Sequence, residues 1–493
     1  NQVIESTIPT TTLYALSTEE LLNLKIADIA CGSGAFLIGV FDHLVKDVER
    51  RIARGESFET NYVVQVGDHS VITLEGRRSI INRCLYGVDI NPEAVEVAKM
   101  SLSLKLIDSY TPSEFDSVGI LGHQILQGVG VNIRCGNSLV GTNVTEIYPS
   151  LIEDTEQLQA TNAFDWNMAF PDVFANGGFD YIVGNPPYVE VKNYNVALPY
   201  MAAYIKHEYT SSKNGKIDLA IPFIEKGVRL LNNGGQLGYI VQKRFFKADN
   251  GKGIRRLLTS EHLLNGIYDY EETNLFAHRI TYVAILVCDR HTEQNRQVWY
   301  AKSTQHGHRL LPANTFTETP WNFETAELNE LRLSLSESLG TLEQVCDVKV
   351  GVQTLWNDAY QIKVNRIEDG IIYGYSVIDN HVAVEVAACK PLLCNENFIP
   401  LTKRAYTTYA LFPYDVTNDG VVTALSMTEF KSRYPLAGAY LEQHKTLICE
   451  NVETLPQRDD TYNAAEHWHL FTRANNHSAI SQKLCVPMTA QYP

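Results

Sequence analysis

Short apolar runs recur along the first 290 residues and alternate with segments of helical periodicity. The runs lie near residues 25–30, 84–90, 131–135, 179–184, 235–242, 265–270 and 280–288, and they predict seven β-strands. Strands that alternate with helices in this way are typical of a doubly wound, mostly parallel α/β sheet. The long interval between the first two strands predicts an extended helix with an insertion around residues 50–80. Residues 189–216 predict a long loop.

The hydropathy pattern changes beyond residue 310. A Leu- and Glu-rich amphipathic stretch near 324–345 predicts a connecting helix, and short β-like runs with turns follow it, beginning at 348–362 and 370–375. We therefore predict three parts: an α/β domain over residues 1–310, a helical connector over 311–345, and a mixed α+β domain over 346–493.

The residues after the fourth predicted strand carry the most specific chemistry. Asn185 offers a side-chain carbonyl oxygen, Pro186 offers a backbone carbonyl beside a fixed φ, and Tyr188 offers a flat ring. Together they could hold a planar NH2 group, with two acceptors for its N–H bonds and a ring for stacking. Two in-line acceptors favour a pyramidal nitrogen and free its lone pair. The alternative is a strand end capped by a Pro-Pro turn.

Three earlier strand ends carry groups that suit an adenosine-containing cofactor. Gly32 and Gly34 allow close backbone approach at the start of a helix, and Asp89 could accept both hydroxyls of a ribose. Asn137 and Ser138 could hydrogen-bond an adenine edge. Ligands of open α/β sheets bind outside the carboxyl ends of the strands. A mere tight turn at the glycines and a helix cap at Asp89 remain as alternatives.

These motifs resemble those of the class I S-adenosylmethionine-dependent DNA adenine-N6 methyltransferases of the gamma order. The likeness covers about residues 20–290. The segment over 164–180 resembles the restriction–modification and phage-defence enzymes that carry a TaqI-like specificity domain. The resemblance implies that residues 346–493 form the target-recognition domain. It also implies S-adenosylmethionine as cofactor, bound by Asp28, Cys31, Gly32, Gly34, Asp89, Ile90, Asn137 and Ser138.

The resemblance further implies a catalytic set. Asn185 and the carbonyl of Pro186 hold the amino group of a flipped-out adenine, while Tyr188 and Phe276 stack on its ring. A core phenylalanine is the alternative for Phe276, and Phe245 and Phe246 are rival aromatics. No metal and no covalent nucleophile is expected, because positioning carries much of the acceleration when the leaving group is already a sulfonium.

Composition and charge refine this prediction. The chain has 493 residues, a net charge of −16 and nine scattered cysteines. No apolar stretch approaches the roughly 18 residues of a membrane span and no secretory signal is visible, so we expect a cytoplasmic protein with no membrane partner. The negative charge argues mildly against a nucleic-acid partner. Locally, however, residues 243–256 hold a basic run interleaved with aromatics, which suits a DNA backbone. Its members are Lys243, Arg244, Lys247, Lys252, Arg255 and Arg256, and the alternative is a solvated helix face.

The predicted function is therefore site-specific adenine-N6 methylation of double-stranded DNA, in restriction–modification or phage defence. Two alternatives remain: a protein glutamine-N5 methyltransferase, which shares the Asn-Pro-Pro-Tyr motif, and a catalytically weak DNA-binding defence component. A nuclease domain or other defence-system subunits are candidate partners. We also expect a fragment of a longer protein with an incomplete recognition domain. No aromatic-Thr-Pro motif or Met precedes the first strand, and an apolar run at 484–488 breaks off near the end.

Overall fold

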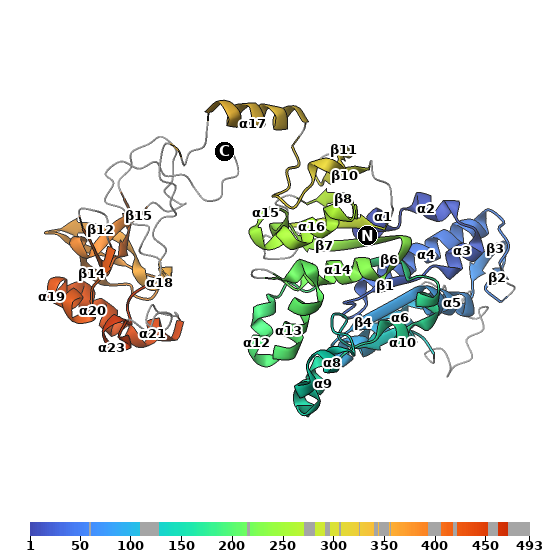
Figure 1. Cartoon of the computed structure of the whole chain (residues 1–493), viewed down its shortest axis with the longest axis horizontal. Helices are drawn as coiled ribbons and strands as arrows, with labels where there is room; N and C mark the ends of the chain where they lie inside the picture. Colours follow the sequence, from blue (N-terminus) through green and yellow to red (C-terminus); the bar gives the residue numbers. More distant parts are fainter. Residues whose placement is uncertain are drawn as a thin grey trace. The chain divides into compact units, whose positions relative to one another are not determined.

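The structure is a computed structural model of the whole chain. It forms two compact units, Asn1–Ala326 and Glu327–Pro493 (Figure 1). It describes residues 1–58, 61–108, 128–213, 217–270, 282–290, 296–304, 307–324, 326–339, 344, 354, 356–392, 406–417, 422–451 and 462–471. Among these residues, every helix is too short or too polar to cross a membrane.

Nine strands of the first unit form one sheet, in the order β11-β10-β8-β9-β7-β6-β1-β4-β5 (Figure 1). Neighbours run parallel from β5 to β7, whereas β9 is antiparallel to both β7 and β8. All seven predicted strands are confirmed, and the hairpin β10–β11 adds two that were not predicted. The bounds are β1 Ile26–Asp28, β4 Leu85–Asp89, β5 Ile133–Cys135, β6 Phe179–Gly184, β7 Leu231–Gln242, β8 Leu264–Asp269, β9 Val283–Asp289, β10 Gln297–Lys302 and β11 Arg309–Pro312.

Both faces of the sheet are buried. Successive side chains of its central strands point to opposite sides, and each side packs into an apolar cluster. On β1, Ile26 packs into one apolar cluster and Ala27 into another. The cluster of Ile26 is covered by α1 Gln2–Thr7, α2 Thr10–Ala15, α3 Thr18–Asn23, α4 Ala35–Ala53, α5 Leu74–Cys84 and α6 Pro92–Lys105. The cluster of Ala27 is covered chiefly by α13 Pro199–Glu208, α14 Ala220–Leu230 and α16 Lys252–Ser260. The sheet is therefore doubly wound, as predicted.

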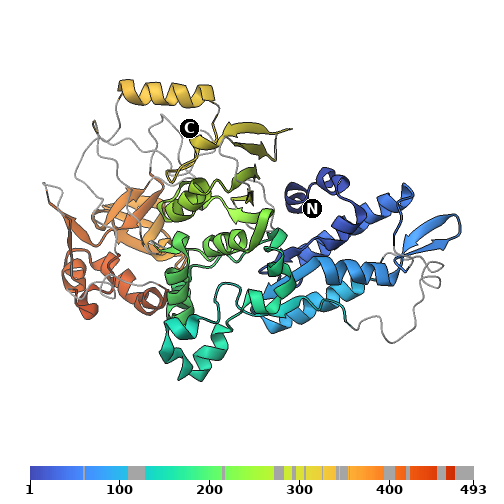
Figure 2. The ribbon, with the colours of Figure 1, turned by 45° about the vertical axis from the view of Figure 1, so that its right-hand side comes forward.

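Two segments between strands differ in how well they were predicted. The insertion expected around residues 50–80 is a hairpin of β2 Val63–Val66 and β3 His69–Ile72 between α4 and α5 (Figure 2). The prediction of a long loop over residues 189–216 is wrong. The described part of this segment folds into η2 Val191–Asn193, α12 Tyr194–Ala197, α13 and η3 Thr210–Ser212. Burial of apolar side chains of α13 in the core stabilises this helical structure.

The shorter elements of the first unit surround its core. They are α8 Val144–Ile147, η1 Pro149–Ile152, α9 Thr155–Thr161, α10 Trp166–Ala169, α11 Pro171–Ala175, α15 Arg244–Lys247, η4 Asp249–Gly251 and η5 Ala313–Thr315. Within the helical connector expected over 311–345, the structure describes the helix α17 Ala326–Leu339. Residues 309–323 instead belong to the first unit, where Trp321 stacks on Phe246 with ring centroids 5.4 Å apart.

The second unit is a mixed α+β domain. Its antiparallel five-stranded sheet has the order β14-β13-β12-β16-β15, beside a hairpin of β17 and β18. The strands are β12 Gln361–Glu368, β13 Ile371–Tyr375, β14 Val382–Glu385, β15 Cys389–Leu392, β16 Thr408–Leu411, β17 Tyr414–Val416 and β18 Val422–Ala424. The helices are α18 Asn357–Tyr360, η7 Val386–Ala388, α19 Met427–Arg433, α20 Pro435–Gln443, α21 Lys445–Asn451 and α23 Ala464–His467.

Candidate active site

The strand ends that carry the predicted site are neighbours in the sheet. Strands β6, β1 and β4 are adjacent and parallel. Asp28 ends β1, Asp89 ends β4, and Asn185 directly follows β6. The predicted cofactor residues and the predicted target-binding residues therefore meet at one edge of the sheet, where ligands of this fold bind.

The turn after β1 leaves space over its backbone. Gly32 has a φ of +51°, and nothing lies within 4 Å of the point where a β-carbon on it would stand. Gly34, with a φ of +86°, precedes α4, and a β-carbon on it would stand 3.1 Å from Cβ of Ala98. Gly32 thus leaves room for a ligand close to its backbone, and Gly34 allows the neighbouring helix α6 to pack closely.

Backbone donors hold Asp89 in place. Its Oδ2 accepts from the N–H of Gly32 at 2.8 Å, and its Oδ1 accepts from the N–H of Asn91 at 2.9 Å. A carboxylate oxygen has about two acceptor sites, so each oxygen retains one for a ribose hydroxyl. Ile90 beside it is 44% exposed and presents an apolar surface. The residues present therefore fit an adenosine group.

Asp28 lies buried behind the same turn. Its Oδ1 accepts from the N–H of Ala30 at 3.0 Å, and it lies 2.8 Å from the point where a β-carbon on Gly184 would stand. Burial raises the pKa of Asp28 to about 7; the bond from Ala30 opposes this rise and the charge of Asp89 adds to it. Cys31 is also buried, and burial raises the pKa of its thiol, so this cysteine is not a reactive thiolate.

The side chains of Asn137 and Ser138 point into the protein. Nδ2 of Asn137 donates to the carbonyl of Thr161 at 3.1 Å, and its Oδ1 accepts from the N–H of Leu139 at 3.1 Å. Oγ of Ser138 donates to the carbonyl of Ile29 at 2.6 Å. These bonds use the groups that were predicted to contact an adenine edge. Both residues thus shape residues 136–139, called the β5 turn below, and their contact with an adenine edge stays a prediction.

At the end of β6, Tyr188 contacts Asn185 directly. The Tyr188 hydroxyl lies 2.6 Å from Oδ1 of Asn185 and 2.9 Å from the carbonyl oxygen of Ile240 on β7. Burial raises the pKa of Tyr188, so the hydroxyl stays protonated and donates. Pro186, which lies between Asn185 and Tyr188 in the sequence, is buried. Phe276, the predicted second stacking ring, lies outside the described residues.

Asp218 was not predicted as part of this region. It forms an antiparallel β-bridge with Glu190, which closes the segment that follows the catalytic motif. Burial raises the pKa of Asp218 to about 6; the N–H of Ala220 and the charge of Arg244 oppose this rise, and the charge of Glu190 adds to it. The residues around Asp218 indicated only the start of a helix. The bridge could not be predicted from them, because it joins residues that are 28 positions apart.

The structure divides the six members of the predicted basic run into four groups, three of which keep some exposure. Arg244 and Lys247 are exposed just beyond the end of β7, at the same edge of the sheet as Asn185. Lys252 and Arg256 are exposed but lie 3.2 and 2.5 Å from the carboxylate of Glu318. Lys243 is partly buried against Asp269, with Nζ 2.6 Å from Oδ1.

Arg255 does not fit the predicted DNA surface. Its side chain is buried, and it donates to the carbonyls of Glu318, Phe245 and Ala248 at 2.9, 2.5 and 2.8 Å. An arginine whose donors are used in this way supports the backbone and has little to offer a phosphate. Phe245 and Phe246 are buried in the core, so neither is free to stack on a base.

Known restriction–modification proteins resemble this chain. The family model of the Eco57I restriction-modification methylase matches residues 83–276. The Type II restriction enzyme and methyltransferase RM.Eco57I of Escherichia coli is 27% identical over 489 residues, covering 95% of this chain and 46% of the relative. The adenine-specific methyltransferase PglX of Streptomyces coelicolor is 24% identical over 245 residues, covering 46% of this chain and 17% of the relative. The chain thus spans about half the length of the Escherichia coli relative, and less of PglX.

A solved structure shares the fold. The Type IIL restriction-modification enzyme MmeI in complex with DNA matches with a TM-score of 0.50 at 13% identity, covering 95% of this chain and 54% of the other. The doubly wound sheet with its glycine turn and strand-end acids defines a class I methyltransferase, a class that uses S-adenosylmethionine. Within this class, residues 83–276 are similar to the Eco57I-type restriction-modification methylases. The resemblance found from the sequence is confirmed.

Proposed function

We propose that this protein is a site-specific DNA methyltransferase that moves a methyl group from S-adenosylmethionine to N6 of an adenine flipped out of double-stranded DNA. The observation that carries the proposal is the arrangement of Asp89 and Asn185 at one edge of the sheet, two strands apart. Similarity to the restriction-modification methylases supports DNA as the substrate. The relative named as an adenine-specific methyltransferase supports adenine as the base.

The chain's own residues would hold and orient the reactants. When bound, S-adenosylmethionine supplies a methyl group on a positively charged sulfur. Asp89 accepts from the ribose, and the backbone at Gly32 allows close approach. Oδ1 of Asn185 and the carbonyl of Pro186 accept the two amino N–H bonds, which draws the nitrogen towards pyramidal geometry. Tyr188 holds the amide of Asn185 and lies against the base. Orientation of this kind supplies a large part of the rate.

Other parts of the chain would bind the DNA and its partners. The second unit would read the target sequence, and Arg244 and Lys247 would contact phosphates beside the flipped base. The Escherichia coli relative is named as both a restriction enzyme and a methyltransferase. A nuclease, in the same polypeptide or in another defence-system subunit, is therefore the expected partner.

Transfer of labelled methyl tests the proposal. The purified chain is incubated with labelled S-adenosylmethionine and plasmid DNA, and the DNA is digested to nucleosides. We expect N6-methyladenine in one sequence context, and no product from Asn185→Ala. A parallel reaction contains a protein extract in place of DNA, and label in a protein glutamine there would favour the protein methyltransferase alternative. DNA binding without any transfer would favour the catalytically weak alternative.

A further inference from the structure

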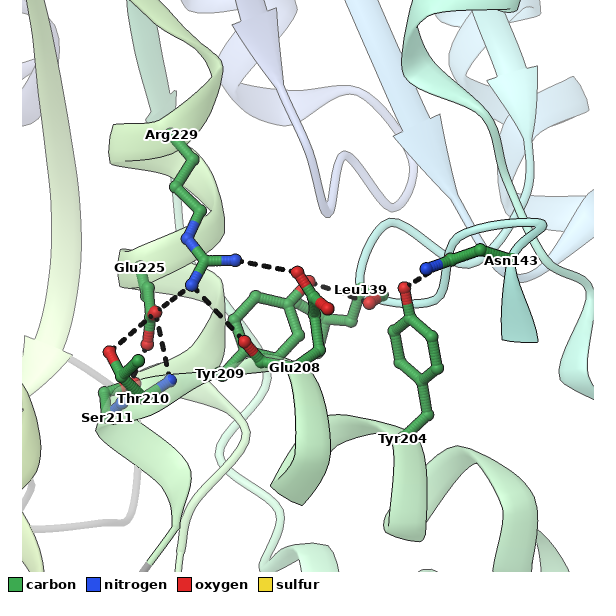
Figure 3. Close-up of polar contacts among 9 residues, drawn as sticks. All are labelled: Leu139, Asn143, Tyr204, Glu208, Tyr209, Thr210, Ser211, Glu225 and Arg229. Carbon is green, nitrogen blue, oxygen red and sulfur yellow. Dashed lines mark hydrogen bonds and ion pairs between the residues drawn. The ribbon is translucent and has the colours of Figure 1, made fainter. Parts of the chain in front are cut away.

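Helices α13 and α14 and the turn η3 meet at a buried carboxylate (Figure 3). Glu225 of α14 is 1% exposed; it accepts from the N–H and Oγ1 of Thr210 at 3.1 and 3.0 Å and from the N–H of Ser211 at 2.9 Å. Arg229, one turn further along α14, donates both to Glu225 and to Glu208. These donors satisfy the buried charge, and they fix η3 firmly on α14.

On one side, η3 is joined to the β5 turn. Tyr209, which precedes η3, is 1% exposed, and its hydroxyl donates to the carbonyl of Leu139 at 2.7 Å (Figure 3). Leu139 in turn donates its N–H to Oδ1 of Asn137. A single hydroxyl bond therefore connects η3 to the turn beside the proposed nucleoside site. Tyr204 makes a similar bond to Oδ1 of Asn143, also at 2.7 Å, further along the chain.

On its other side, η3 lies directly against α16. A β-carbon on Gly253 would stand 2.5 Å from the carbonyl oxygen of Ser211, so the two backbones touch with no side chain between them. The exposed surface of α16 carries Lys252 and Arg256. Because packed interiors transmit small shifts, a displacement of η3 also displaces this basic helix.

We propose that Tyr209 is a positioning residue that couples cofactor binding to DNA binding. Its bond to Leu139 makes the β5 turn, η3 and α16 move as one body, so that a filled nucleoside site raises the affinity for DNA. The inference rests on the function proposed above. Linkage requires that DNA raise the affinity for the cofactor by the same factor. Tyr209 itself contacts neither the base nor the methyl group.

The coupling is measured on the full chain as a ratio of two DNA dissociation constants. The first is measured without ligand and the second with saturating S-adenosylhomocysteine, which has no methyl group to transfer. The DNA is a fluorescent duplex that the wild-type protein methylates. We expect a ratio of at least five for the wild type and below two for Tyr209→Phe. Tyr204→Phe, which removes a matched hydroxyl from α13, should keep the wild-type ratio.

A second variant covers the case in which Tyr209→Phe fails to fold. Gly253→Ala acts at the other contact, and it should lower the ratio without changing cofactor affinity in the absence of DNA. A wild-type ratio in folded Tyr209→Phe, or in Gly253→Ala where Tyr209→Phe does not fold, overturns the proposal. So does an equal loss in Tyr204→Phe, which would mean general loosening of α13. A wild-type ratio of one overturns this inference alone, whereas absence of any methylated duplex overturns the proposed function with it.

Discussion

The hydroxyl of Tyr188 lies 2.6 Å from Oδ1 of Asn185, so the two side chains of the same four-residue motif are hydrogen-bonded to each other. A second acceptor, the carbonyl of Ile240, lies 2.9 Å from the same hydroxyl and anchors the pair to β7. The amide oxygen is therefore oriented before any target base enters the site.

This relationship separates two substitutions in one motif. Tyr188→Phe keeps the ring and removes the hydroxyl; we expect the methyl-transfer rate to fall about three- to tenfold, since one hydrogen bond contributes about 0.5–1.5 kcal/mol. Asn185→Ala removes an acceptor of the target amino group and should abolish transfer. Single-turnover rates and calorimetric cofactor affinity check both variants, and the affinity should be nearly unchanged in each. Near-normal transfer by Asn185→Ala would contradict the mechanism.

Asp89 predicts a loss on the cofactor side. Replacement by Ala removes the acceptor for the ribose hydroxyls, and hydrogen bonds to a charged group contribute about 1.5–3 kcal/mol each. We expect at least tenfold weaker binding of S-adenosylmethionine by calorimetry. Asp89→Asn keeps Oδ1 for the N–H of Asn91 and serves as the matched variant, with an intermediate loss. An unchanged affinity in folded Asp89→Ala would remove this residue from the site.

The basic residues of α15 and the acidic partner of α16, Glu318, should have opposite effects on DNA binding when they are replaced. Replacing Arg244 and Lys247 together by Gln should reduce the salt dependence by about 0.9 for each lost phosphate contact. Glu318→Gln should instead tighten binding, because it releases Lys252 and Arg256 from their counter-charge. The check is titration of a fluorescent duplex at several salt concentrations, with Lys46→Gln on α4 as control. If the double variant kept the wild-type slope, Arg244 and Lys247 would belong to a solvated face.

Asp28 predicts a dependence of stability on pH. Its folded pKa of about 7 lies above the ordinary value of 3.8, so its contribution is fully present below about pH 4 and is lost as the pH rises through 7. Asp28→Asn keeps an oxygen for the N–H of Ala30 and removes the charge. It should therefore be more stable than wild type at pH 8, on the order of 2–4 kcal/mol, and lose this advantage near pH 4.

Thermal or urea unfolding at several pH values measures this difference. Asp68→Asn, an exposed acid on the turn between β2 and β3, is the control and should show no such trend. Parallel stability curves for Asp28→Asn and wild type would show that the buried carboxyl does not titrate near neutrality.

Strand positions and strand-end residues were predictable because their physical causes are local. A sheet buried on both faces needs apolar runs, and parallel strands bring their ends to one edge. The hairpin β10–β11 was missed: β10 has only the short apolar run 298–301 and mixes exposed and buried positions, and β11 alternates partly buried and exposed ones. Tertiary packing of α13, not local composition, decided the segment after the catalytic motif.

Individual side chains were harder to predict than elements. Ser138 bonds to Ile29 across 109 positions, and no short pattern signals such a contact. Arg255 and Arg256 are chemically identical neighbours, yet one is buried and the other exposed. Helical periodicity carried a weak signal here, because Arg255 lies next to the buried positions Ile254 and Leu258.

The hairpin β10–β11 and the rings behind it define where the first unit could be joined to a different second unit. Phe323 stacks on Tyr300 of β10 with ring centroids 4.8 Å apart. A chimera joined at residue 310 would cut β11 in two and remove that ring, leaving an edge of β10 open to pairing with other molecules. We expect chimeras joined after residue 324 to keep β11 paired with β10, so the second unit is best exchanged at the start of α17.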